Sequence, residues 1–187
     1  MQENSFKFFT LNYWRSIDKK ILFCFLILFF LGLFFSFSST SSLAGERLNK
    51  DYYFFFTKHL IFTILAISIM MIISFIRTEV LIKLVIPAFV VSFIFLAIVP
   101  IIGVEAKGAR RWLNLYFFNL QPVEILKPLF ILMTVKILTY KNFQNYHIKY
   151  FLSFILLSCV IILLIDQPDL GQSILLTSSW IATVFVS

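Results

Sequence analysis

The stretch Leu84–Ile102 reads LVIPAFVVSFIFLAIVPII and carries no charged side chain over its 19 residues. A helix of about 20 apolar residues crosses the hydrocarbon core of a bilayer, and a helix is favoured there because it satisfies its own backbone hydrogen bonds. Ile21–Phe37 and Leu60–Ile76 are also uncharged and have 17 residues each. The sequence therefore predicts an all-α, polytopic integral membrane helical bundle.

Composition and the weaker apolar segments extend this prediction. Of the 187 residues, 60% are hydrophobic, 13% are charged and 25 are Phe, whereas a soluble domain has about a quarter charged residues. A soluble domain is thereby excluded, and no nucleic-acid partner is expected. We expect a single membrane domain, 1–187, with six crossing helices at about 21–37, 60–76, 84–102, 121–139, 150–165 and 170–187 and outer loops at about 38–59, 103–120 and 166–169.

The basic residues predict that the N-terminus lies in the cytoplasm. In this orientation the cytoplasmic segments hold nine Lys and Arg residues and the outer segments hold six, with Lys127 near the outer edge of its helix. Positive charge is enriched on the cytoplasmic side, and the first helix usually dominates. The first outer loop contains an aromatic run, Tyr52–Phe56, which is typical of the membrane interface.

The two ends of the chain raise the questions of signal-peptide cleavage and of truncation. Lys19 and Lys20, an apolar run and then Ser42–Gly45 superficially match a signal peptide. The run is long and bulky, so an uncleaved anchor is the expected state. The last predicted helix ends at Ser187 without the basic flank that usually follows a membrane helix, which indicates a truncated chain.

Two Gln-Pro clusters, each followed by an acid, stand at the starts of predicted helices: Gln121-Pro122-Val123-Glu124 and Gln167-Pro168-Asp169-Leu170-Gly171. Proline suits position N1, because the first helical turn leaves its N–H groups unpaired. A carboxylate just beyond it faces the positive end of the helix dipole. Either cluster alone is equally well an ordinary helix start. Ionisable groups at membrane helices tend to be functional, so we predict a polar site on the outer side.

Three cations lie close to these clusters. Arg110 and Arg111 belong to the run Lys107-Gly108-Ala109-Arg110-Arg111-Trp112, and Lys127 follows Glu124 by three residues. Arg and Lys near the outer interface suit the stabilisation of a leaving phosphate charge. Glu124 and Lys127 share a helix face and are expected to pair, and a buried pair would orient Lys127. The simplest alternative for the two arginines is contact with lipid headgroups.

Cysteine and histidine residues predict neither a disulfide nor a metal site. Cys24 and Cys159 lie in apolar spans, where a cysteine usually acts as a small buried hydrophobe. Neither belongs to a CxxC arrangement. His59 and His147 fall at helix ends on opposite sides of the predicted membrane, so they cannot form one ligand set.

The motifs together resemble the SEDS family (shape, elongation, division and sporulation). The resemblance rests on Lys107–Leu113, on the spacing to Gln121–Lys127, and on Gln167–Gly171. The first outer loop, Ser42–Arg47 followed by Asp51–Phe54, is more similar to the division branch than to the elongation branch. The family usually has Ser where Val123 stands.

The resemblance implies a ten-helix membrane glycosyltransferase, of which this chain is the N-terminal part. Such an enzyme polymerises lipid II, the undecaprenyl-pyrophosphate-linked disaccharide-peptide, into peptidoglycan on the outer face of the cytoplasmic (inner) membrane at the division septum. Its implied partners are a transpeptidase of the penicillin-binding class and other division proteins.

Specific residues match the family's motifs. Substrate binding is implied for Arg111, Glu124, Lys127 and Asp169, with Arg110 added from its place near the interface. Structural roles are implied for Gly108, Trp112, Gln121, Pro122, Gln167, Pro168 and Gly171. The family's catalytic base is an aspartate in an outer loop between its seventh and eighth helices, beyond this chain. No catalytic residue is therefore predicted, the chain alone is expected to be inactive, and the need for a divalent cation stays open. A lipid II flippase or transporter and a non-catalytic fragment that docks division proteins are the alternatives.

Overall fold

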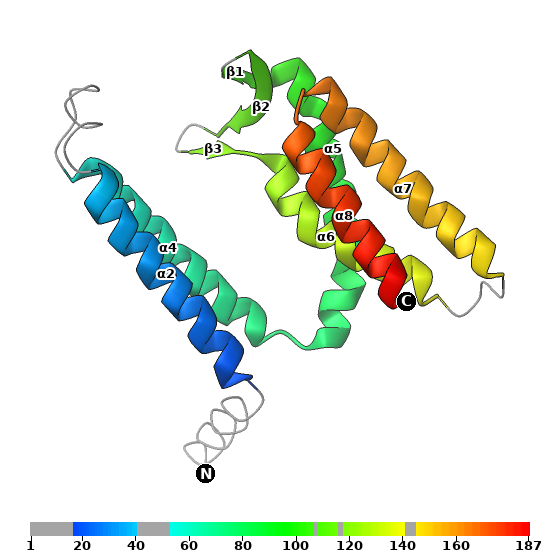
Figure 1. Ribbon diagram of the computed structural model, residues 1–187, viewed down its shortest axis with the longest axis horizontal. Coiled ribbons are helices and arrows are strands. Elements are labelled where there is room, and N and C mark those ends of the chain that lie inside the picture. The colour runs from blue at the N-terminus through cyan, green and yellow to red at the C-terminus, as the bar shows by residue number, and fades with distance from the viewer. Residues whose placement is uncertain (1–16, 41–52, 107, 116–117, 141–144) are drawn as a thin grey trace, which may run out of the picture. The chain divides into compact units, whose positions relative to one another are not determined.

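The computed structural model describes residues 17–40, 53–106, 108–115, 118–140 and 145–187. Within these residues it contains six helices and three short strands. They divide into two compact units, with the boundary between Arg77 and Thr78, and each unit is described by itself (Figure 1). The all-α class predicted from the sequence is confirmed.

The first unit is a pair of helices, α2 (Lys19–Thr40) and α4 (Phe54–Ser74), which lie side by side and run in opposite directions (Figure 1). Gly32 of α2 faces α4, because a Cβ atom at this position would lie 3.7 Å from His59 Nε2. At one end of the pair Phe37 meets the ring of Phe56, with centroids 5.4 Å apart. Three residues of the predicted aromatic loop run thus belong to α4, while Tyr52 lies outside the described residues.

The second unit is a four-helix bundle of α5 (Thr78–Ile102), α6 (Pro122–Leu138), α7 (Tyr146–Asp166) and α8 (Leu170–Val186). Every one of these helices contributes to a single core: Phe89, Leu96, Val123, Leu126, Phe130, Leu157, Val160, Leu164 and Leu176. Trp180 of α8 donates through Nε1 to Ser153 Oγ of α7 at 3.2 Å. The bond links α7 to α8 and gives the indole N–H the hydrogen-bond partner that a tryptophan in a packed interior usually has.

The segment predicted as the loop 103–120 contains a small antiparallel sheet in the order β1-β2-β3. Its strands are β1 (Val104–Ala106), β2 (Ala109–Asn114) and β3 (Asn119–Leu120). Gly108 has a φ of 78°, a left-handed conformation that glycine adopts without steric cost, and it leads into β2. The sheet lies at the end of the bundle where α5 ends and α6 and α8 begin (Figure 1), so it can reach the helix starts.

Among the described residues, four helices are long and apolar enough to cross a membrane: α2 over Lys19–Ser38, and the whole of α4, α5 and α7. The remaining two have 17 residues each, and α6 also carries Glu124, Lys127 and Lys136. Most helices extend past the predicted apolar stretches, because flanking polar and aromatic residues continue the backbone ladder. Six crossings, the orientation and a single membrane domain stay predictions.

The burial predicted for the two cysteines is wrong. Both Cys24 and Cys159 are exposed, on faces of α2 and α7 that turn away from their packed neighbours. In a membrane helix the outward face is apolar too, so an apolar sequence context does not predict which side faces the protein.

Candidate functional site

A proline in α5 creates an acceptor that anchors the turn between α7 and α8. Pro100 lies inside α5, and because proline has no N–H, the carbonyl four residues earlier loses its helical donor. That carbonyl belongs to Leu96, whose exposure is 0%. Gln167 donates to it through Nε2 at 2.9 Å and is itself 3% exposed. A buried carbonyl without a donor costs about 1–3 kcal/mol, so Gln167 fixes the turn firmly against α5.

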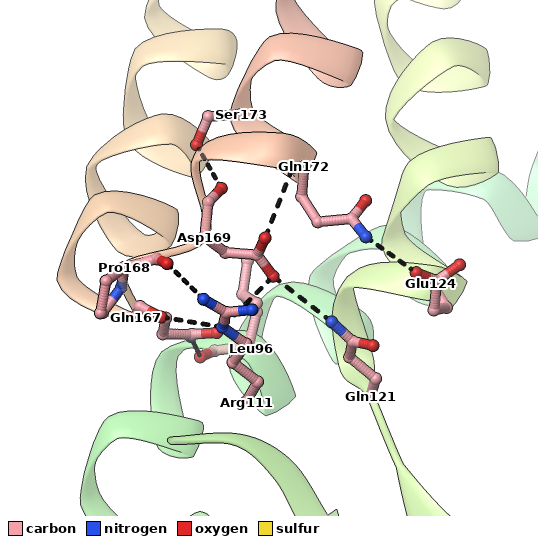
Figure 2. A network of polar contacts seen from close by, with 9 residues as sticks. All are labelled: Leu96, Arg111, Gln121, Glu124, Gln167, Pro168, Asp169, Gln172 and Ser173. Atoms are coloured by element: carbon pink, nitrogen blue, oxygen red, sulfur yellow. Dashed lines mark hydrogen bonds and ion pairs between the residues drawn. The ribbon is translucent and has the colours of Figure 1, made fainter. Parts of the chain in front are cut away.

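Arg111 of β2 grips the same turn (Figure 2). Its Nε donates to the backbone carbonyl of Gln167 at 3.2 Å, and Nη2 donates to the carbonyl of Pro168. Its guanidinium also forms an ion pair with Asp169, with 3.7 Å between Nε and Oδ2. One side chain therefore binds three consecutive residues, a geometry that suits the forked guanidinium better than the point charge of lysine.

The two Gln-Pro clusters start their helices differently. Pro122 stands at N1 of α6 with Gln121 as the N-cap, as predicted. The corresponding prediction for Pro168 is wrong, since α8 begins at Leu170 and its N-cap is Asp169. The Asp169 side chain accepts from the backbone N–H of Gln172 at 3.5 Å. A carboxylate is a preferred N-cap, and this shifts the helix start beyond the proline.

The two helix starts are joined through side chains. Gln121 makes no capping bond with its own helix and instead donates through Nε2 to Asp169 Oδ2 at 3.4 Å. Glu124 and Lys127 form the predicted pair, with 2.7 Å between Oε2 and Nζ. The expected burial of this pair is wrong: the Glu124 side chain is 50% exposed and the Lys127 side chain is 20% exposed. Gln172 donates through Nε2 to the other carboxylate oxygen of Glu124, Oε1, at 3.1 Å (Figure 2).

We call this connected group the polar cluster; it consists of Arg111, Gln121, Glu124, Lys127, Asp169 and Gln172. It unites four of the five predicted substrate-binding residues. Arg110 is set apart: Nη1 donates to the carbonyl of Pro100 at 3.3 Å, and Nε lies 3.7 Å from Glu105 Oε2. Arg110 thus caps the last turn of α5, where a cation also complements the helix dipole.

Strand geometry explains why two adjacent arginines diverge. Side chains alternate between the faces of a strand, and along β2 Ala109 and Leu113 are buried, whereas Arg110 is exposed. The register also shifts between Val104 and Glu105, so that Arg111 lies opposite no residue of β1. Such bulges re-aim a side chain. A strand prediction for Ala109–Asn114 would therefore place Arg110 and Arg111 on opposite faces from the sequence alone.

Gln172 is not among the site residues predicted from the sequence, although a local sequence pattern points to it. Asp169-Leu170-Gly171-Gln172 has the spacing of a capping box, in which an N-cap residue is followed three positions later by Glu or Gln. Here the Gln172 side chain turns to Glu124 instead of back to the N-cap. Gly171, predicted as structural, has open space around it, since a Cβ atom there would meet nothing within 4 Å. Trp112 is exposed on β2.

The polar cluster is chemically suited to hold an anion. Its two cations and two carboxylates balance, which keeps both cations in place without a ligand. An ammonium has three donors and a guanidinium has five, so Lys127 and Arg111 retain donors beyond their carboxylate partners. Among the described residues no three His, Cys, Asp or Glu side chains gather as a metal site.

Known proteins are similar to this chain in sequence and in fold. The profile of the cell cycle protein family FtsW/RodA/SpoVE matches residues 18–187. A probable peptidoglycan glycosyltransferase FtsW of Caulobacter vibrioides is 31% identical over 183 residues, which cover 94% of this chain and 46% of the relative. The Wigglesworthia glossinidia brevipalpis protein of the same name is 32% identical over 172 residues, with 91% and 45% covered.

Solved structures agree. A chain from the structure described as "Structural coordination of polymerization and crosslinking by a peptidoglycan synthase complex" matches with a TM-score of 0.74 and 25% identity, covering 91% of this chain and 48% of that one. The Thermus thermophilus rod shape determining protein RodA matches with a TM-score of 0.60 and 27% identity, covering 78% and 49%. The chain spans about half the length of the curated relatives it matches. With the motifs, the helical bundle and these matches in agreement, the chain belongs to the FtsW/RodA/SpoVE family of cell cycle proteins.

Proposed function

We propose that this chain forms the substrate-binding part of a peptidoglycan glycosyltransferase of cell division, which builds glycan strands from lipid II on the outer face of the cytoplasmic membrane. The observation that carries the proposal is the polar cluster, which brings Arg111, Lys127 and Asp169 from three distant segments to one end of the bundle. Both relatives described above are named probable peptidoglycan glycosyltransferase and not transporter, which favours this function over a flippase.

The chemistry of strand growth fits such a site. A sugar hydroxyl attacks an anomeric carbon, the bond from that carbon to a lipid-linked pyrophosphate breaks, and the pyrophosphate leaves with the negative charge. Preorganised cations stabilise charge that develops in this way. Arg111 is anchored to two backbone carbonyls, whereas the contact recorded for the Lys127 ammonium is with the Glu124 carboxylate. We assign Lys127 to the pyrophosphate and Arg111 mainly to the alignment of Asp169.

The attacking hydroxyl also needs a base, and the polar cluster does not offer a free one. Glu124 is held by Lys127 and Gln172, and Asp169 is held by Arg111 and Gln121. Carboxylates committed to these donors are poorly placed to accept a proton from substrate. The proposal therefore assigns binding and electrostatic stabilisation to this chain. Base catalysis and crosslinking by a partner transpeptidase of the penicillin-binding class are assigned to other segments or chains.

Binding of lipid II to the purified chain in lipid nanodiscs tests the proposal. Lys127→Met keeps the apolar stem and removes the charge, and we expect the Kd for lipid II to rise about 10-fold or more, as for the loss of a charged hydrogen bond. Lys136→Met is the matched control on the same helix, because Lys136 Nζ donates to the carbonyl of Ile82 away from the polar cluster. Equal affinity of wild type and Lys127→Met, or no binding by wild type, would refute the proposal.

Neighbouring arginines supply a second contrast. We expect Arg111→Lys to weaken binding of lipid II, because lysine cannot hold three residues of the turn at once. Arg110→Lys should leave the Kd unchanged, since Arg110 caps α5 on the other face of β2. Equal losses for the two variants would mean that both arginines bind substrate, as the sequence alone predicts.

A further inference from the structure

Gln172 is the residue that connects the two ion pairs of the polar cluster. Its backbone N–H donates to Asp169 Oδ1 at 3.5 Å, and its side-chain amide donates to Glu124 Oε1 at 3.1 Å. Asp169 pairs with Arg111, and Glu124 pairs with Lys127. A series of polar contacts therefore leads from Arg111 through Asp169 and Gln172 to Glu124, as Figure 2 shows. The ion pair between Glu124 and Lys127 completes the series.

Glu124 needs this second donor to hold a fixed position. Its partner Lys127 stands three residues later on the same helix, so the ion pair itself includes no residue of α8. Glu124 is half exposed, and exposed pairs of long side chains are weakly ordered. The amide from the first turn of α8 occupies the remaining carboxylate oxygen and ties the pair to that turn. Arg111 is tied to the same turn through its three contacts.

We propose that Gln172 is a positioning residue, which acts through Glu124 to hold Lys127 at a fixed place relative to Arg111. The inference rests on the proposed function, and its consequence is that one lipid-linked pyrophosphate meets a preset pair of cations instead of two independent ones. A neutral amide suits the task, because a carboxylate at this position would repel Glu124, and an ammonium would compete with Lys127 for it.

Lipid II binding measures the positioning effect. In Gln172→Ala we expect the Kd to rise about 3- to 10-fold, the size of one lost hydrogen bond. Ser178→Ala is the matched control, since Ser178 lies on the same helix and its hydroxyl donates to the carbonyl of Leu175 within that helix. The Kd of this variant for lipid II should equal that of wild type. In a Glu124→Ala background, Gln172→Ala should add nothing further, because the residue through which it acts is gone.

Exchange of the two residues provides a rescue. Gln172→Glu places two carboxylates within hydrogen-bond distance and should bind lipid II more weakly than Gln172→Ala. The exchange Glu124→Gln with Gln172→Glu restores one amide and one carboxylate across the same gap, and should bind better than Gln172→Glu alone. If Gln172 only packed against its neighbours, the double exchange would not rescue binding. Failure of the double exchange to rescue binding would therefore overturn the inference.

Thermal unfolding of the purified chain separates the two possible failures. Non-additive shifts in Tm for Glu124→Ala and Gln172→Ala would support the contact, and additive shifts would refute it, whether or not lipid II binds. If wild type binds lipid II and Gln172→Ala binds equally well, the positioning role is refuted while the proposed function stands. If wild type does not bind lipid II, the proposed function fails, and the positioning role fails with it.

Discussion

Replacement of Gln167 by leucine should destabilise the chain through a carbonyl that lies 71 residues away. The change removes the donor to Leu96 O while it keeps a side chain of similar size. Leu96 is fully buried, so its carbonyl cannot turn to water, and the expected loss is about 1–3 kcal/mol. Side-chain hydrogen bonds between membrane helices contribute about 0.6 kcal/mol on average. We expect the upper range, because Pro100 leaves this acceptor no helical alternative.

The loss should depend on Pro100, and that dependence is the decisive measurement. Pro100→Ala returns an N–H that can bond the carbonyl of Leu96 within α5. In that background Gln167→Leu should cost much less, so the two changes should be strongly non-additive. Pro87→Ala is the matched control, since Pro87 lies in the same helix but its orphan carbonyl is a different one.

The assay is thermal unfolding of the purified chain in detergent. For a chain of this size about 1 kcal/mol shifts Tm by roughly 2–4 °C, so Gln167→Leu should lower Tm by about 2–12 °C in wild type and in Pro87→Ala. An equal decrease in the Pro100→Ala background would show that Gln167 stabilises the turn by some means other than the orphan carbonyl.

Three further predictions concern topology, coupling and catalysis. In a cysteine-free background, a cysteine at Asn114 should react with an impermeant thiol reagent in intact cells or spheroplasts, whereas one at Gln144, outside the described residues, should not; the reverse pattern would contradict the N-in orientation. Glu124→Ala and Lys127→Ala should each abolish most lipid II binding, and the double variant should be little worse, because the carboxylate acts through the ammonium that it positions; additive losses would show that the two act independently. The 187-residue chain alone should not polymerise lipid II, because loss of a general base costs about 10²–10⁴-fold in rate; glycan strands formed by the purified chain would refute this, and co-expression with the C-terminal half of the Caulobacter relative should restore turnover.

Local rules were sufficient for the features that depend on a few neighbouring residues. Uncharged stretches such as Leu84–Ile102 predicted helices, because length and hydropathy act within one segment. Pro122 at N1 and the Glu124–Lys127 pair followed from spacings of one helical turn. The family resemblance likewise rested on short motifs. Local reasoning was wrong for Pro168, where the N-cap preference of Asp169 outweighed the preference of proline for N1.

The long-range contacts that build the polar cluster came only from the tertiary structure. Gln121 and Asp169 lie 48 residues apart, and Arg111 and Gln167 lie 56 apart. No periodicity links such positions, because their proximity depends on how four helices pack and where a short sheet ends. The sequence by itself determined which segments are helical and which polar residues stand at their ends. Packing decided that Arg111 faces the turn while Arg110 caps α5, since the direction of a side chain is set by the strand and the bundle around it.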